Sequence, residues 1–148
     1  MDLLIIGKFS PAFRKALIEG RVDLDGLNWE YASIHGYRGV RLHASENPKD
    51  HKLSRKDFNS QIENDKPVPS GGEHDRDYFS CSCFTDIVAL TDALKLRTSA
   101  MRRRTWLIAE GNVCKEYGPV DGYLPHINWY LFADASPQNK FRLSSGYE

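Results

Sequence analysis

The sequence has few cysteines, no long apolar run and no excess of charge of either sign. Its three cysteines, Cys81, Cys83 and Cys114, are an odd number and too sparse for a disulfide scaffold, which is typical of a reduced, cytosolic protein. Lysine plus arginine number 20, and so do aspartate plus glutamate, so no global field favours a nucleic acid or an anionic membrane as the partner. The apolar run at residues 3–6 is too short to span a membrane, and Asp2 stands where a signal peptide would be basic. We therefore expect a cytoplasmic protein without a membrane segment.

The usual nucleotide and metal signatures are also missing. Neither G-x-x-x-x-G-K-[ST] nor G-x-G-x-x-G occurs in the sequence. His43, His51 or His74 could join the cysteines at 81 and 83 around a metal, but the spacing matches no common zinc pattern. These two cysteines share one face of a predicted strand, which favours buried core thiols. We predict no resident metal.

The order of the predicted helices and strands indicates a small α+β domain. The chain is about one domain long and 41% hydrophobic, enough for a single core over residues 1–148. One helix begins at Ser10 and Pro11 and stops at Gly20, and a second begins at Thr85 and Asp86. Strands are expected at 3–6, 78–84, 105–109, 126–133 and 141–143, and one that begins at 27 and ends near His35, followed by a turn and a possible second short strand up to 42. This order favours mostly antiparallel sheets with two main helices.

A long polar stretch interrupts the pattern between residues 43 and 76. It is rich in proline, glycine and charged residues and has few apolar anchors. Long connections without regular structure are uncommon inside small domains, so this loop is either mobile or functional, for example as a lid or a recognition loop.

Three short segments carry the most specific signal. They are I-H-G at 34–36, D-Y-F-S at 77–80 before a helix, and an apolar strand at 104–110 that runs on to K-E-Y-G-P at 115–119. Together they resemble the ADP-ribosyltransferase fold, particularly the group with a His, Tyr, Glu triad that includes rifampin ADP-ribosyltransferases and poly(ADP-ribose) polymerases. The resemblance covers residues 29–121 without the polar loop. It implies two facing antiparallel sheets around a cleft for NAD, the co-substrate.

The resemblance also implies a role for each matching residue. His35 would hydrogen-bond a hydroxyl of the adenosine ribose, and Gly36 would let the backbone approach NAD closely. Tyr78 would stack on the nicotinamide ring. Glu116 would stabilise the oxocarbenium character that the ribose gains when nicotinamide leaves. Such a protein would transfer ADP-ribose to an unknown acceptor, in a toxin, effector or defence-related setting.

Other residues resemble the arginine-directed branch of the same superfamily or compete for the catalytic role. Arg38 and Ser80 match the arginine and the serine-rich strand of that branch, which implies that both contact NAD. The paired glutamates of the branch are absent, because Cys114 takes the first position of the pair. Glu110 and Asp121 remain alternative catalytic carboxylates.

The alternative function is a binding module without catalysis, such as an inhibitor or immunity protein. Its interface would be the aromatic strand at 129–132 together with the polar loop, although burial between layers explains that strand equally well. The run Arg102, Arg103, Arg104 beside Trp106 could grip the phosphates of a nucleic acid and stack a base. In a neutral protein such a run is more often a solvated helix end.

Overall fold

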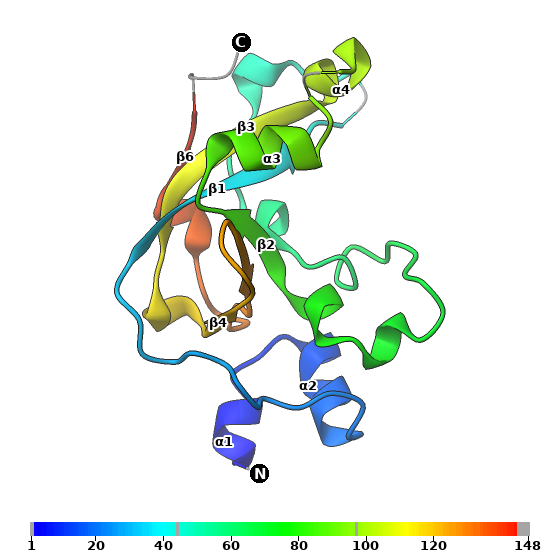
Figure 1. Ribbon diagram of the computed structural model, residues 1–148, viewed down its shortest axis with the longest axis vertical. Coiled ribbons are helices and arrows are strands. Elements are labelled where there is room, and N and C mark those ends of the chain that lie inside the picture. The colour runs from blue at the N-terminus through cyan, green and yellow to red at the C-terminus, as the bar shows by residue number, and fades with distance from the viewer. Residues whose placement is uncertain (1, 44, 97, 145–148) are drawn as a thin grey trace.

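An antiparallel sheet of six strands organises the residues that the computed structural model describes, 2–43, 45–96 and 98–144. The strand order is β4-β5-β2-β1-β3-β6 (Figure 1). The strands are β1 (Ile34–Arg41), β2 (Cys81–Phe84), β3 (Trp106–Val113), β4 (Val120–Asp121), β5 (His126–Trp129) and β6 (Phe141–Leu143). The described residues also contain four α-helices, which confirms the predicted α+β class.

The sheet consists of two three-stranded halves that meet at a single residue pair. β1 pairs with β3 along eight residues, and β2 pairs with β5 along four. Between β1 and β2 the only pair in the described residues is Tyr37 with Phe84. The halves β4-β5-β2 and β1-β3-β6 therefore form one continuous sheet, where two separate facing sheets were expected.

Two of the four helices were predicted from their capping residues. α2 (Pro11–Ile18) has Pro11 at its first position and is followed by Gly20 with a positive φ of 74°. α3 (Ile87–Ala93) begins after Asp86, whose carboxylate accepts a hydrogen bond from the Val88 N–H. None of the helices in the described ranges has the length and apolar character that crossing a bilayer requires.

The predicted strand at residues 3–6 is wrong, because this segment is the short helix α1 (Leu3–Ile6). The Asp2 side chain accepts hydrogen bonds from the N–H groups of Leu4 and Ile5, which satisfies two free donors of the first helical turn. Leu3 and Leu4 are exposed and only Ile6 is buried, so the apolar run does not supply a core strand.

Strand boundaries also differ from the prediction in ways that matter for the site. β1 begins at Ile34, so His35 lies inside a long strand and not at its end. β3 continues past Glu110 to Val113. The strand predicted from Tyr78 begins only at Cys81, because residues Arg76–Phe79 form a 3-10 turn that the Asp75 side chain caps.

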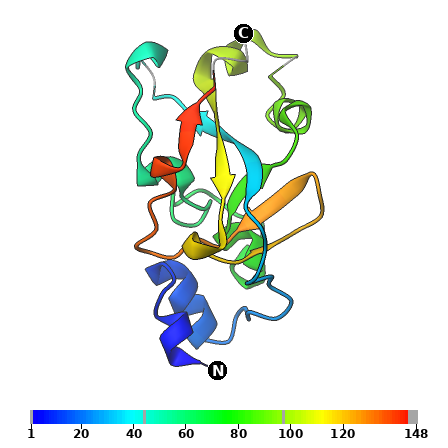
Figure 2. The same cartoon turned by 90° about the vertical axis from the view of Figure 1, so that its left-hand side faces the viewer.

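Each face of the sheet has its own cover. α3 lies in front of the sheet in Figure 1 and to its right in Figure 2, whereas the first part of the polar loop (teal) lies on the opposite face and α1 and α2 (blue) lie at the lower end. Phe58 of this loop is fully buried and packs edge-on against Phe141 of β6. α4 (Ala100–Thr105) leads directly into β3.

Two residue groups whose role the sequence left open lie in the core: Cys81, Cys83 and Trp129 are in the cluster with Phe58, and Tyr130 is in the cluster with α1 and α2. Cys81 and Cys83 are buried free thiols, as predicted. Trp129 and Tyr130 are fully buried, so the aromatic strand is core and its assignment as an exposed interface is wrong.

Candidate functional site

His35 contacts a carboxylate across the strand pair β1 and β3. Its Nε2 lies 3.3 Å from Oε2 of Glu110, and the imidazole is about half exposed. Arg142 on β6 donates from Nε and Nη2 to Oε1 of the same carboxylate, at 3.2 and 2.9 Å. The hydrogen bond from His35, and secondly that from Arg142, hold the pKa of Glu110 below its usual value. Glu110 is therefore ionised at neutral pH.

A row of neighbouring residues, joined by side-chain contacts and by one strand pairing, leads from this contact across the junction of the two sheet halves. The His35 ring meets the Tyr37 ring edge-on, with centroids 5.1 Å apart, and Tyr37 pairs with Phe84 on β2. The Phe84 ring lies 5.0 Å from the ring of His126 on β5. His126 in turn shares a 2.5 Å hydrogen bond with a β2 hydroxyl. We call this set the junction row; its members are Glu110, His35, Tyr37, Phe84, His126 and Ser82.

Burial controls the charge of His126 at the far end of the junction row. Burial lowers the pKa of His126, while the negative charges of Asp77 and Asp121 act in the opposite direction. The imidazole is therefore neutral at pH 7. Because its Nε2 shares a hydrogen bond with the Ser82 hydroxyl, the pair offers a fixed polar contact next to the aromatic rings.

Beyond His126 two carboxylates share hydrogen-bond donors. The Nδ2 group of Asn128 donates to Oδ1 of Asp121 at 3.0 Å and to Oδ1 of Asp77 at 3.3 Å. The Tyr130 hydroxyl donates to the same two oxygens at 3.2 and 3.5 Å. Burial, and then the nearby charges of Asp75 and Asp121, raise the pKa of Asp77. Asp77 is therefore protonated more readily than an exposed aspartate.

Structural contacts occupy the polar groups of Asp121 and Ser80. Arg76 donates from Nη2 to Oδ2 of Asp121 at 2.6 Å. The Ser80 hydroxyl is buried and donates to the Asp77 carbonyl at 2.8 Å and to Oδ1 of Asn128 at 3.2 Å. These contacts fix the turn before β2 against β4 and β5, and they leave the Ser80 hydroxyl little capacity to donate to NAD.

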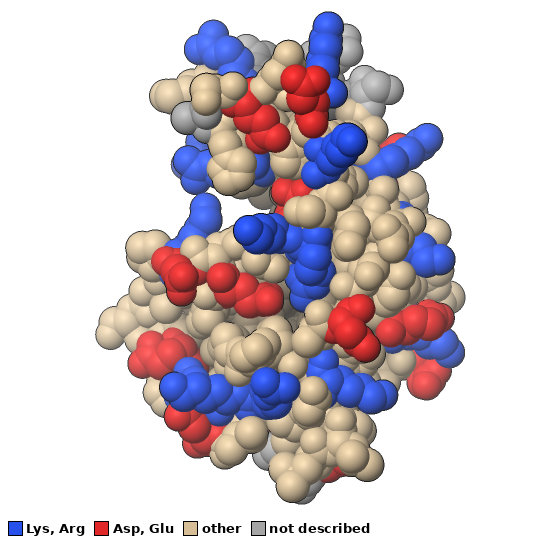
Figure 3. All heavy atoms as spheres, turned by 180° about the vertical axis from the view of Figure 1, so that it is seen from behind, with Lys and Arg blue, Asp and Glu red and all other residues tan. Residues whose placement is uncertain are grey.

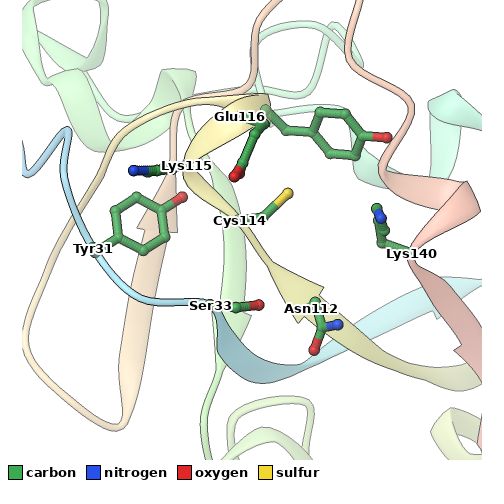
Figure 4. Close-up of a pocket in the computed structure, with 8 residues that line it drawn as sticks. Tyr31, Ser33, Asn112, Cys114, Lys115, Glu116 and Lys140 are labelled. Carbon is green, nitrogen blue, oxygen red and sulfur yellow. The ribbon is translucent and has the colours of Figure 1, made fainter.

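Glu116 lies just beyond the C-terminal end of β3, in a cavity that Asn112, the strand partner of His35, also lines (Figure 4). The cavity has a volume of about 430 Å³, and we call it the Glu116 pocket. Carboxylate, phenol, thiol, amide and ammonium groups surround it, from Tyr31, Ser33, Asn112, Cys114, Lys115, Glu116, Tyr117 and Lys140. Burial, and then the charge of Glu116, raise the pKa of Cys114, so the thiol is protonated at neutral pH and is a poor nucleophile. The pocket has the groups for holding a polar ligand.

The structure does not bring His35, Tyr78 and Glu116 together. Tyr78 precedes the start of β2, whereas His35 lies near the end of β2, because Tyr37 pairs with Phe84. Glu116 follows the end of β3 and lines its own pocket, which neither His35 nor Tyr78 reaches.

Gly36 and Arg38 have structural partners. Gly36 is buried, and a Cβ at this position would lie 3.0 Å from the Val113 side chain, so the glycine permits close packing of β1 on β3. Arg38 donates to three main-chain carbonyls, those of Ser82 (2.7 Å), Asp57 (2.8 Å) and Asn59 (2.9 Å). It therefore joins β1, β2 and the polar loop.

The remaining predicted groups are spread over the surface and the polar loop. Arg102 and Arg104 are exposed on α4, and the side chain of Arg103 is outside the described part of the structure. His51 lies between Glu46 and Asp57, at 2.6 and 3.1 Å. Within the described ranges, no group of three or more His, Cys, Asp or Glu side chains is placed to hold a metal ion.

Comparisons with protein-family models, with curated proteins and with solved structures find no match for this chain.

Sequence reasoning overlooked most of the junction row, namely Tyr37, Ser82, Phe84 and His126. A usable signal was present in the two-residue alternation of strands, which places residues 35 and 37 on one face. The pairing of β2 with β1 and β5, which completes the row, is not encoded locally.

Proposed function

We propose that this protein is an ADP-ribosyltransferase-like enzyme that binds NAD over the junction row and transfers ADP-ribose to an acceptor. One observation carries the proposal: the contact of His35 with ionised Glu110 lies next to the aromatic pair of Tyr37 and Phe84, where the two halves of the sheet meet. An imidazole, a carboxylate and flat rings are the groups that this chemistry uses.

In this proposal Glu110 takes the role that the resemblance gave to Glu116. The bond from nicotinamide to the ribose breaks, nicotinamide leaves with the bonding electrons, and the ribose gains oxocarbenium character. An ionised carboxylate beside that ribose stabilises the developing positive charge. The low pKa of Glu110 keeps this carboxylate charged at neutral pH. The acceptor nucleophile then attacks the anomeric carbon, and its proton passes to Glu110 or to solvent.

Tyr37 replaces Tyr78 as the stacking residue. Tyr37 and Phe84 are half-buried against the helix α3, and both retain exposed ring surface. Aromatic rings stack in an offset arrangement, which an exposed part of a ring permits. His35, next to Tyr37 on the same strand face, offers a hydrogen bond to a ribose hydroxyl.

Nicotinamide release from NAD tests the proposal. We expect wild-type protein to release nicotinamide, Glu110→Gln to lose at least 90% of that rate, and Glu116→Gln to keep it. His35→Ala is expected to weaken NAD binding, measured by the rise in Tm on adding NAD. Absence of NAD binding and of nicotinamide release in the wild type would overturn the proposal. Equal loss in Glu116→Gln alone would return the catalytic role to Glu116.

A non-enzymatic binding module remains the second candidate. The separation of His35, Tyr78 and Glu116 favours it, because these residues do not form a common NAD site. In this case the protein would neither bind NAD nor release nicotinamide, and its ligand would occupy another surface.

A further inference from the structure

A second cavity lies at the end of β1, on the side where the polar loop folds behind the sheet. It has a volume of about 510 Å³, within the range of small-molecule sites. Five basic or imidazole side chains line it together with one indole: Arg38, Arg41, His43, Lys56, Lys66 and Trp106. We call it the basic pocket. Figure 3, which views the molecule from behind, shows basic side chains gathered around a hollow in the upper half of that face.

The positive charge of the basic pocket is not neutralised within the described structure. Arg41, Lys56 and Lys66 have exposed side chains with no ion pair or hydrogen bond to another described residue. The single acidic residue of the lining, Asp57, directs its Oδ2 to the imidazole of His51 and to the Ser54 N–H. Three free cations around one cavity favour an anion that carries more than one charge.

Arg38 makes the floor of the basic pocket rigid. Its guanidinium donates to carbonyls of the polar loop at 57 and 59 and of β2 at 82, and none of these acceptors carries a formal charge. Its positive charge therefore adds to that of the three free cations. The same bonds hold Lys56 and Asp57 against β1, so the pocket is formed before a ligand arrives.

Trp106 supplies an aromatic wall. Its indole is half-buried and packs over Gly39, where a Cβ would lie 3.2 Å from the ring. The ring is thus held in one orientation at the edge of the pocket. Arg102 and Arg104 are exposed on α4, the helix that leads directly into Trp106. Fixed aromatic faces with flanking cations are the elements that hold a base and its phosphate.

We infer that the basic pocket binds a nucleoside phosphate, with the phosphate on Arg41, Lys56 and Lys66 and the base on Trp106. The arginines on α4 favour a nucleotide within a single strand of nucleic acid, whose next phosphate would lie over that helix. This site is separate from the junction row and does not depend on the protein being an enzyme.

Fluorescence anisotropy with two probes tests the inference: a fluorescein-labelled twelve-residue oligothymidylate and a fluorescent ATP derivative. We expect the oligonucleotide to bind. The logarithm of its association constant should fall linearly with the logarithm of the salt concentration, with a slope of about −2 for three phosphate contacts. The triple variant Arg41→Gln, Lys56→Gln, Lys66→Gln should lose at least tenfold in affinity and most of the salt dependence. Trp106→Leu should lose affinity while keeping the salt dependence.

A matched control removes the same number of charges elsewhere. Lys15, Lys49 and Lys52 are exposed and lie outside the basic pocket, so their triple glutamine variant should bind as the wild type does. Pocket-dependent binding of the ATP derivative alone would assign the site to a free nucleotide. Absence of binding by both probes, or equal loss in pocket and control variants, would overturn the inference. Circular dichroism of each variant separates misfolding from lost contacts.

Discussion

Arg38 donates a 2.7 Å hydrogen bond to the main-chain carbonyl of Ser82, and this bond joins β1 to β2 where the sheet itself provides only one residue pair. The same guanidinium binds two carbonyls of the polar loop. One side chain therefore connects both halves of the sheet and the segment behind them. Arg38 also lines the basic pocket, and it follows Tyr37 of the junction row in the chain.

Removing the guanidinium should destabilise the whole domain. Arg38→Met keeps the aliphatic stem but leaves three carbonyls without their donor, and hydrogen bonds to a charged group contribute about 1.5–3 kcal/mol each when they are buried. Because Arg38 is only half-buried and water can replace part of the loss, we expect a decrease of about 3 kcal/mol in the free energy of unfolding, measured by urea denaturation. Arg142→Met, at an exposed arginine, should change it by less than about 0.5 kcal/mol. A similar small change in Arg38→Met would contradict this role.

The stability of the polar loop should depend on the charge of His51. Burial alone would lower the pKa of His51, but hydrogen bonds from the imidazole to Glu46 and Asp57 outweigh burial and raise it. A raised pKa means that the folded protein binds the proton more tightly than the unfolded chain. The stabilisation is therefore complete at pH values below the pKa of His51 in the unfolded chain, near 6.5, down to the acid range where Glu46 becomes protonated. It is lost as the pH rises through the pKa of His51 in the folded protein.

Urea denaturation of wild type and His51→Gln between pH 5.5 and 8.5 measures this effect. The difference in unfolding free energy between the two proteins should be largest at pH 5.5 and should shrink above pH 6.5. Taking the difference removes the opposite contribution of His126, whose pKa is lowered and which is unchanged in both proteins. A difference that stays constant with pH would show that His51 contributes only through packing.

Gly111 should tolerate no side chain. A Cβ there would lie 2.1 Å from the Lys140 carbonyl and 2.6 Å from Cα of Phe141, both main-chain atoms that cannot rotate away. Gly111→Ala would force β6 away from β3, next to the Glu110 and Arg142 pair. We therefore expect the free energy of unfolding, measured by thermal or urea denaturation, to decrease by about 3 kcal/mol. Gly7→Ala is the matched control, because its nearest contact is at 3.4 Å and its φ is −63°. Equal stability of the two variants would mean that β6 docks loosely.

Local signals in the sequence predicted the local structure well. The Ser10-Pro11 start of α2 and the Asp86 cap of α3 are short-range features, and both helices are where these features place them. The capping of α1 by Asp2 is equally local, but an apolar run of four residues does not distinguish a helical turn from a strand.

Non-local pairing explains what the sequence could not predict. His35 and Glu110 are 75 residues apart, and their contact depends on the register between β1 and β3. That register cannot be obtained from segment composition, so Glu110 was only one of three candidate carboxylates. The order of Glu116 and Tyr78 along the chain likewise gave no information on which end of the sheet each would occupy: Tyr78 precedes β2 and Glu116 follows β3, and both strands run antiparallel to β1.

Cys114 reports on the charge of Glu116 inside its pocket. Burial raises the pKa of the Cys114 thiol, the negative charge of Glu116 raises it further, and the positive charge of Lys140 lowers it. Thiolate is the reactive form, so the rate of labelling by a disulfide reagent at pH 8 follows the thiolate fraction. Glu116→Gln should therefore speed the labelling of Cys114 severalfold, and Lys140→Gln should slow it. The buried thiols at 81 and 83 should react only after unfolding, which identifies the signal. Rates that change in the same direction in both variants would mean that access to the pocket, and not its charge, controls this thiol.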